Sequence, residues 1–332
     1  MFDQPLVFVR CLTYNHEAYI EDALNGFIMQ QTTFPFVVTI VNDASPDNTI
    51  QVLDNFVSEN CLLEKVEHSK TDYADIISAI PTKNPNCLLY ILNLHENHFG
   101  KKSHRPYYQH FVDKAKYWAE CEGDDYWTDP LKLQKQVDIL EADETLMAVC
   151  TDTSVVDNQN NVLNAKRGGV VKNDIEGRYN LRDFFKNNHQ YPTASVIYRT
   201  THQEEVQQKQ TYTRNAYLGD WNLWICLHIF GDFYYINEPM VAYRINPLSL
   251  THTCSRVGRA KASWTICRAV ADILPEEYAD ISAKLRKPDD AWVSLMFAYK
   301  YEKKYLHMLG CAIISMIKCP KVLLDKWKKR KR

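Results

Sequence analysis

Several features that mark other classes of protein are missing from this sequence of 332 residues. Its ten cysteines include no C-x-x-C pair, and several lie inside apolar runs, where cysteine behaves as a small buried hydrophobic residue. The first apolar segment, at Leu6, is too short for a signal peptide and has no basic lead-in. These absences favour a protein of the reducing cytoplasm over a disulfide-linked secreted one.

Neither sign of charge is in large excess, since the sequence has 39 Lys and Arg residues and 41 Asp and Glu residues. This balance argues against general nucleic-acid binding. No G-x-G-x-x-G motif follows the first predicted strand, which argues against a dinucleotide-binding dehydrogenase. The composition, 45% hydrophobic and 24% charged, is that of a globular chain with a sizeable core. The length suits one large α/β domain or two ordinary ones.

The first half of the chain is predicted to alternate strands and helices. Strands are expected at 5–11, 36–41, 87–92 and 117–121, and helices at 17–30, 50–59 and 130–141. This alternation predicts a mostly parallel central sheet flanked by helices. In such sheets ligands bind at the carboxyl ends of the strands.

Polar clusters follow four of the predicted strands, at 13–15, 43–47, 94–100 and 122–125. The last cluster places Glu122, Asp124 and Asp125 within four residues. Carboxylates this close repel each other unless a cation joins them, and one or two carboxylates plus substrate phosphates commonly hold Mg²⁺. A solvated acidic turn is the alternative. Four polar loops at one edge of a sheet favour a binding site there.

Three segments resemble the inverting family 2 glycosyltransferases, which have the Rossmann-like GT-A fold: LTYNHEAYIEDALNGFIMQ, VTIVNDASPDNTIQVLDNF and ECEGDDYWTDPLKLQKQVDILE. The resemblance extends over about residues 5 to 252. It implies a GT-A domain over 1–252, with a donor half to about 127 and an acceptor half after it, and a helical extension with a basic tail over 253–332. The implied activity is transfer of a sugar from a nucleotide-diphosphate donor to an acceptor hydroxyl.

The resemblance assigns roles in the donor half. Asp43 is expected to read the nucleobase, and the loop of Thr13, Tyr14 and Asn15 to flank the nucleoside. Ser45 is expected at the donor as well. The structural alternatives are helix capping for Asp43 and Ser45, packing for Tyr14 and a turn for Asn15.

The acidic cluster at 122–125 resembles the D-x-D motif of the family. Glu122 takes the first acidic position, near the ribose, and Asp124 takes the second and is the candidate ligand for Mn²⁺ or Mg²⁺. The sequence departs from the family pattern at three positions. Asn42 replaces the first Asp of the usual pair, Ala44 replaces Gly, and Glu122 replaces Asp.

The second half is expected to supply the acceptor side and the base. The run YLGDWNLWICLHIFG predicts a core-facing helix with Asp220 in its first turn, and the resemblance makes this acid the general base. Stabilisation by the helix dipole is the alternative reason for an acid there. Arg244 is expected to face phosphate, with a surface ion pair as the alternative, and His252 is a weaker candidate for a third metal ligand.

The C-terminal part is predicted to be helical, and its apolar run at 307–317 is shorter than the about 20 residues that span a bilayer. An apolar helix beside Trp327 and a Lys/Arg tail predicts contact with an anionic membrane surface. A packed helix with a solvated tail is the alternative.

The sequence therefore predicts an inverting, metal-assisted glycosyltransferase, with a UDP-sugar as the expected donor. The expected acceptor is a glycan or a lipid-linked glycan, in the synthesis of cell-surface polysaccharide or glycolipid at the inner face of the cell membrane. Two alternatives are a non-catalytic nucleotide-sugar or glycan-binding protein of the same fold, and a membrane-associated interaction module.

Overall fold

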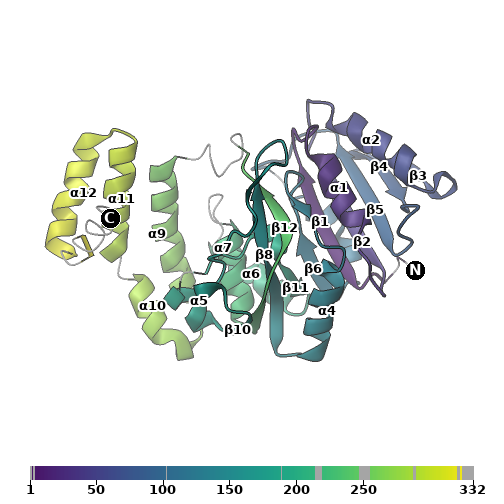
Figure 1. Cartoon of the computed structure of the whole chain (residues 1–332). Helices are drawn as coiled ribbons and strands as arrows, with labels where there is room; N and C mark the ends of the chain where they lie inside the picture. Colours follow the sequence, from purple (N-terminus) through teal and green to yellow (C-terminus); the bar gives the residue numbers. More distant parts are fainter. Residues whose placement is uncertain are drawn as a thin grey trace. The chain divides into compact units, whose positions relative to one another are not determined.

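The computed structural model describes residues 2, 4–101, 103–187, 189–213, 219–246, 255–286, 289–319 and 322–323 (Figure 1). The chain divides into two compact units. The first spans Met1–Gln203 and Phe230–Asn246, and the second spans Glu204–Ile229 and Pro247–Arg332. The second unit thus includes residues 204–229, whereas the sequence analysis drew its boundary at residue 252.

A sheet with 12 strands in the described residues forms the first unit. Its centre consists of four parallel strands, in the spatial order β6 (Tyr117–Glu120), β1 (Val7–Thr13), β2 (Phe36–Asn42) and β5 (Cys87–Leu94). Every residue of β2 is buried, as in a parallel strand covered on both faces. These are the four strands that the apolar runs predict, so the expected parallel centre is confirmed.

Strands outside this centre make the sheet mixed. Beyond β5 lies the antiparallel hairpin of β4 (Ala74–Ala79) and β3 (Glu67–Lys70). Beyond β6 come β11 (Ile197–Arg199), β8 (Leu146–Val156), β12 (Asp232–Arg244) and β10 (Gly177–Tyr179). The short strands β7 (Tyr126–Trp127) and β9 (Val162–Asn164) pair with β12 and β8. The sequence analysis did not predict β3, because all four of its residues are exposed and it has no apolar pattern.

Three helices bury their apolar sides in the main hydrophobic core with residues of β1 and β2: α1 (Ile20–Ile28), α2 (Thr49–Asn60) and α4 (Lys132–Ala142). Helix α1 lies very close to β7, because a Cβ atom on Gly26 would be 2.8 Å from the backbone nitrogen of Trp127. Glycine at this position therefore lets α1 pack directly on the strand that follows the acidic loop. The shorter helices α3 (Gln109–Val112) and α5 (Leu181–Asn187) also belong to this unit.

The second unit is helical, as the sequence predicts for the C-terminal part. Its helices are α6 (Gln203–Thr213), α7 (Gly219–His228), α9 (Arg256–Ile273), α10 (Ala279–Arg286), α11 (Asp289–Tyr301) and α12 (Tyr305–Lys318). Leu295 and Tyr299 of α11 pack with Val257 of α9 and Cys311 of α12 in a core of their own. Within the described residues, no helix combines the length and the apolar character needed to cross a bilayer.

Lys132 is fully buried at the start of α4. Its ammonium group donates to Gln136 Oε1 at 2.8 Å and lies 4.3 Å from the centroid of the Trp127 ring. Burial lowers the pKa of Lys132 to about 7 from its ordinary value of 10.5, against the opposing influence of Cys121 and Asp129.

This shift predicts a pH-dependent stability. Between those two pKa values the unfolded chain binds a proton at Lys132 that the folded chain lacks, so the free energy of unfolding rises with pH in this window. We expect the wild type to gain on the order of 1 kcal/mol per pH unit relative to Lys132→Met. Urea unfolding of both proteins from about pH 7.5 to about pH 9.5, near the centre of this window, measures the difference. Parallel pH profiles would show that Lys132 stays protonated in the folded protein.

Candidate functional site

The parallel register brings the predicted loops to one edge of the sheet. Thr13 pairs with Asn42, Asn42 pairs with Asn93, and Arg10 pairs with Glu120. The loops that follow β1, β2, β5 and β6 therefore leave the sheet side by side, as expected. We call this the carboxyl edge.

Asn42 connects three of the strand ends. Its Nδ2 donates to Asn93 Oδ1 at 3.1 Å, and its Oδ1 accepts from the hydroxyl of Ser45 at 2.5 Å. Ser45 Oγ in turn accepts from the backbone N–H of Asn15 at 3.1 Å. Ser45 thus connects the loop after β1 to the loop after β2. Ser45 is not the N-cap of α2, which is Asn48, and the N–H of the first helical residue, Thr49, donates to Asp47 Oδ1 at 3.1 Å.

Asp43 is buried behind these contacts. Its Oδ1 accepts from the backbone N–H of His98 at 2.7 Å and lies 3.3 Å from Nε2 of His104. The side chain of Asn97 donates to the carbonyl of Asp43 at 3.0 Å. Burial lowers the pKa of His104, and the hydrogen bond that its ring makes to the carboxylate of Asp43 opposes this effect. The loop after β5 therefore fixes the orientation of the carboxylate.

The acidic loop folds back onto the end of β1. The N–H of Gly123 donates to the carbonyl of Leu12 at 2.8 Å, and the N–H of Asp125 donates to the carbonyl of Glu122 at 3.1 Å. A Cβ atom on Gly123 would lie 2.9 Å from both Thr13 Oγ1 and His16 Nδ1. Glycine is therefore required for this close contact between the two loops.

Asp124 points toward the first loop. Its Oδ2 lies 3.9 Å from His16 Nε2 and 3.5 Å from Asn246 Nδ2. Burial lowers the pKa of His16, against the influence of Asp124 and Asp47, and favours the neutral imidazole, which is the form that binds metals. Within the described part of the chain, His16 Nδ1 and Thr13 Oγ1 are buried without a hydrogen-bond partner.

Asp125 has a different environment from its neighbour. Its Oδ1 accepts from the backbone N–H of Arg244 at 2.8 Å. Burial raises the pKa of Asp125, and the charge of Asp124 raises it further. The two adjacent acids therefore differ in role: Asp125 attaches the loop to β12, and Asp124 faces His16.

Arg244 is an anchor of the acidic loop, and its side chain is only 1% exposed. Its guanidinium donates to the carbonyl of Asp124 at 2.8 Å, to the carbonyl of Asp157 at 3.1 Å and to Asp22 Oδ2 at 2.8 Å. It also lies over the ring of Tyr19, 4.7 Å from the centroid. The ion pair with Asp22 is buried on the arginine side, so it is not the surface ion pair given as the alternative for Arg244. Contact with phosphate stays a prediction.

The remaining predicted residues have varied settings. Tyr14 is 45% exposed, and Asn15 has a left-handed backbone with φ of 57°. Glu122 is half-buried in the acidic loop. Asp220 lies exposed in the first turn of α7, in the second unit, and its role as the general base stays a prediction. His252 and the basic tail from residue 324 lie outside the described residues.

His16 and His104 are the neighbours that the sequence analysis missed. Each stands far in sequence from the acid it approaches, and neither belongs to an apolar pattern. Their position in loops that follow parallel strands is the signal that would have indicated them.

The chemistry of the carboxyl edge suits a divalent cation. Among the described residues no three His, Cys, Asp or Glu side chains converge at metal-binding distance. The carboxylate of Asp124 does lie beside the imidazole of His16, and near Gly123 both the Nδ1 of this ring and the hydroxyl of Thr13 are buried without a hydrogen-bond partner in the described part of the chain. A cation held by so few protein ligands needs phosphate oxygens and water to complete its coordination shell.

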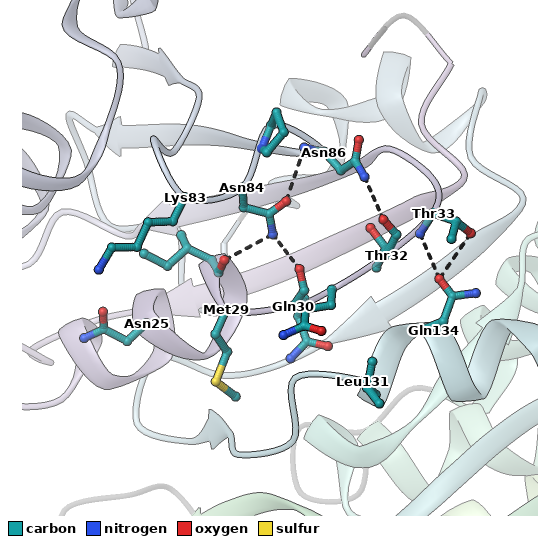
Figure 2. Close-up of a pocket in the computed structure, with 13 residues that line it drawn as sticks. Asn25, Met29, Gln30, Thr32, Thr33, Lys83, Asn84, Asn86, Leu131 and Gln134 are labelled. Carbon is teal, nitrogen blue, oxygen red and sulfur yellow. Dashed lines mark hydrogen bonds between the residues drawn. The ribbon is translucent and has the colours of Figure 1, made fainter.

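A groove of about 780 Å³ lies at the other end of β2 and β5 (Figure 2). The amides that line it bind protein atoms: Asn84 Nδ2 donates to the carbonyls of Ile28 at 3.1 Å and Gln30 at 2.7 Å. Gln134 Oε1 accepts from the N–H of Thr33 at 2.8 Å. These bonds connect the segment after α1 to the segment before β5 and to α4. The amide side chains in the groove therefore have a structural role.

Breaking the Arg244 anchor should destabilise the first unit. Arg244→Met leaves the carbonyls of Asp124 and Asp157 and the carboxylate of Asp22 without their donors. We expect the free energy of unfolding to fall by about 3 kcal/mol in urea titrations.

The matched control is Arg178→Met, which removes an exposed arginine that pairs with Asp143 and Asp232. Exposed pairs contribute little, so its unfolding midpoint should stay close to that of the wild type. Equal effects of the two substitutions would contradict the anchor assignment.

Comparison with known proteins gives three kinds of match. Residues 11–80 match the model of glycosyl transferase family 2. The proteins Rv1520 of Mycobacterium tuberculosis and Mb1547 of Mycobacterium bovis are each 28% identical to the chain over 248 residues, which cover 73% of this chain and 59% of those proteins. The chain therefore spans about three-fifths of the length of the curated relatives it matches.

Solved structures provide the third match. The TarS 1-349 structure from S. aureus has a TM-score of 0.57 at 14% identity, covering 97% of this chain and 91% of that one. TarS 1-349 in complex with UDP-GlcNAc has a TM-score of 0.55 at 13% identity, covering 97% and 92%. The mannosyltransferase PcManGT from Pyrobaculum calidifontis, in complex with GDP-Man and Mn²⁺, has a TM-score of 0.51 at 15% identity, covering 96% and 82%. These likenesses confirm the GT-A fold expected from the sequence.

Proposed function

We propose that this chain, a family 2 glycosyltransferase by its match over residues 11–80 and its GT-A fold, transfers a sugar from a nucleotide-diphosphate donor to an acceptor hydroxyl. The observation that carries the proposal is the convergence of Asp43, Asp124 and their loops at the carboxyl edge. TarS and PcManGT were solved with UDP-GlcNAc and GDP-Man, which supports a nucleotide sugar as the donor. The sequence resemblance favours uridine as the base.

Asp43 is suited to the nucleobase. A carboxylate accepts hydrogen bonds, and the N–H of His98 holds Oδ1 of Asp43 in one orientation. A preorganised acceptor recognises a base edge that presents an N–H group. Thr13, Tyr14 and Asn15 lie on the neighbouring loop, where they would flank the nucleoside, and Glu122 would approach the ribose.

Asp124 is the proposed metal ligand, with His16 beside it as a second candidate. A divalent cation bound there, Mn²⁺ or Mg²⁺, would offset the negative charge that develops on the departing diphosphate. The close contact of Gly123 with Thr13 and His16 keeps side-chain bulk out of this position. Arg244 acts mainly through the loop backbone, because its donor groups already bind protein oxygens.

Asp220 is the proposed general base, on the sequence resemblance. A carboxylate that removes the proton of the attacking hydroxyl contributes about 10²–10⁴-fold to the rate. A single displacement with one base and no enzyme nucleophile would invert the anomeric centre. We further propose a glycan or lipid-linked glycan acceptor, in the synthesis of cell-surface polysaccharide or glycolipid.

Asp124→Ala should abolish the metal-dependent part of donor binding, because the cation loses its carboxylate. The measurement is the thermal shift produced by UDP with and without MnCl₂, since a ligand that binds only the native state raises its stability. We expect Mn²⁺ to enhance the UDP shift in the wild type and in the control Asp138→Asn, whose acid is exposed on α4. An Asp124→Ala protein that still binds UDP more tightly with Mn²⁺ would remove Asp124 from the metal site.

Asp220→Asn should separate binding from chemistry. We expect UDP affinity to stay near that of the wild type while release of UDP from UDP-sugars, with a panel of glycan acceptors, falls by about 10²-fold or more. Asp272→Asn, an exposed acid in the same unit, is the control. Undiminished turnover in Asp220→Asn excludes the base role. A wild type that binds UDP but never releases it from a UDP-sugar would favour the non-catalytic binding protein.

A further inference from the structure

One side of α12 carries apolar side chains that do not contribute to the described core. Leu306, Leu309, Ile313, Met316 and Ile317 are 85%, 53%, 58%, 61% and 75% exposed. Their spacing of three, four, three and one residues places them along one side of a helix. We call these five residues the α12 stripe.

The other side of α12 is packed. Cys311 and Ser315 are buried, and Met308 lies against the core that includes Val257 and Tyr299. The helix is therefore held in its unit without the stripe. The expectation of an ordinary packed terminal helix accounts for this buried side, but it leaves the stripe unexplained.

Basic residues lie at both ends of α12. Exposed Lys300, Lys303 and Lys304 come just before the helix, and exposed Lys318 is its last residue. The sequence from 318 to 332 contains eight Lys or Arg residues and one Asp. An apolar helix side between cationic ends matches an anionic lipid surface, where acyl chains lie beneath negatively charged headgroups.

We propose that the α12 stripe docks the protein on an anionic membrane, with the helix lying in the plane of the interface. Its 14 residues span about 21 Å at 1.5 Å per residue, too short to cross the bilayer core but suited to lying along its surface. Pairing of two copies through the stripe is disfavoured, because either orientation brings the lysines of one copy near those of the other. Membrane docking goes beyond glycosyl transfer and does not depend on it.

The test is flotation of the full chain with vesicles of phosphatidylcholine and phosphatidylglycerol, beside vesicles of phosphatidylcholine alone. We expect binding to the anionic vesicles, and a loss of about tenfold or more in the combined variant Leu306→Ser, Leu309→Ser and Ile313→Ser. Thermal unfolding of this variant should match the wild type, because the three side chains are exposed.

The matched control is Val162→Ser with Leu163→Ser. These residues of β9 are 62% and 57% exposed and belong to the first unit, so their replacement should leave vesicle binding unchanged. Lys303→Glu with Lys304→Glu should lower binding to the anionic vesicles.

Three results would overturn the proposal. The first is unchanged vesicle binding by the stripe variant. The second is a wild type that binds no vesicles but forms a dimer in light scattering, with the dimer lost in the stripe variant. This result would mean that a second copy of the chain covers the stripe. The third is vesicle binding that arises only after deletion of residues 320–332, which would show that the chain's own tail covers the stripe.

Discussion

The candidate site depends on the attachment of the acidic loop to the end of β12 by Arg244. The backbone N–H of Arg244 binds the carboxylate of Asp125, and its guanidinium binds the carbonyl of Asp124. Because one of the two adjacent acids is occupied in this way, the other is directed toward His16. The charge of Arg244 also lowers the pKa of the buried Asp125, against the effect of burial, so it stabilises a carboxylate that would be costly without a partner.

The departures from the family pattern have a physical explanation at two positions. An amide at Asn42 both donates to Asn93 and accepts from Ser45, whereas a carboxylate only accepts. Asn42 therefore joins three strand ends without adding a second charge beside Asp43. Ala44 adopts φ of 55°, a left-handed conformation that is free for glycine and costs roughly 1 kcal/mol for other residues. The hydrogen bonds of Ser45 to Asn42 and Asn15 stabilise the backbone in this conformation.

The sequence predicted the parts of the fold that leave a local pattern. β1, β2, β5 and β6 are buried apolar runs, and the acidic loop follows one of them directly. The exposed polar strand β3 left no such pattern. The contact of His16 with Asp124 joins residues over a hundred positions apart, so only the sheet order reveals it. The assignment of α7 to the second unit follows from tertiary packing, which no local period encodes.

The near-neutral total charge conceals an uneven distribution. Residues 318–332 hold eight of the 39 basic residues and one of the 41 acidic residues, which leaves 31 basic and 40 acidic residues in 1–317. An anionic surface attracts the first set and repels the second, within a Debye length of about 8 Å at physiological salt. The charge balance that argues against nucleic-acid binding therefore does not argue against a membrane. On such a surface, the proposed docking would be supported by the lysines at the two ends of α12, beside the apolar stripe.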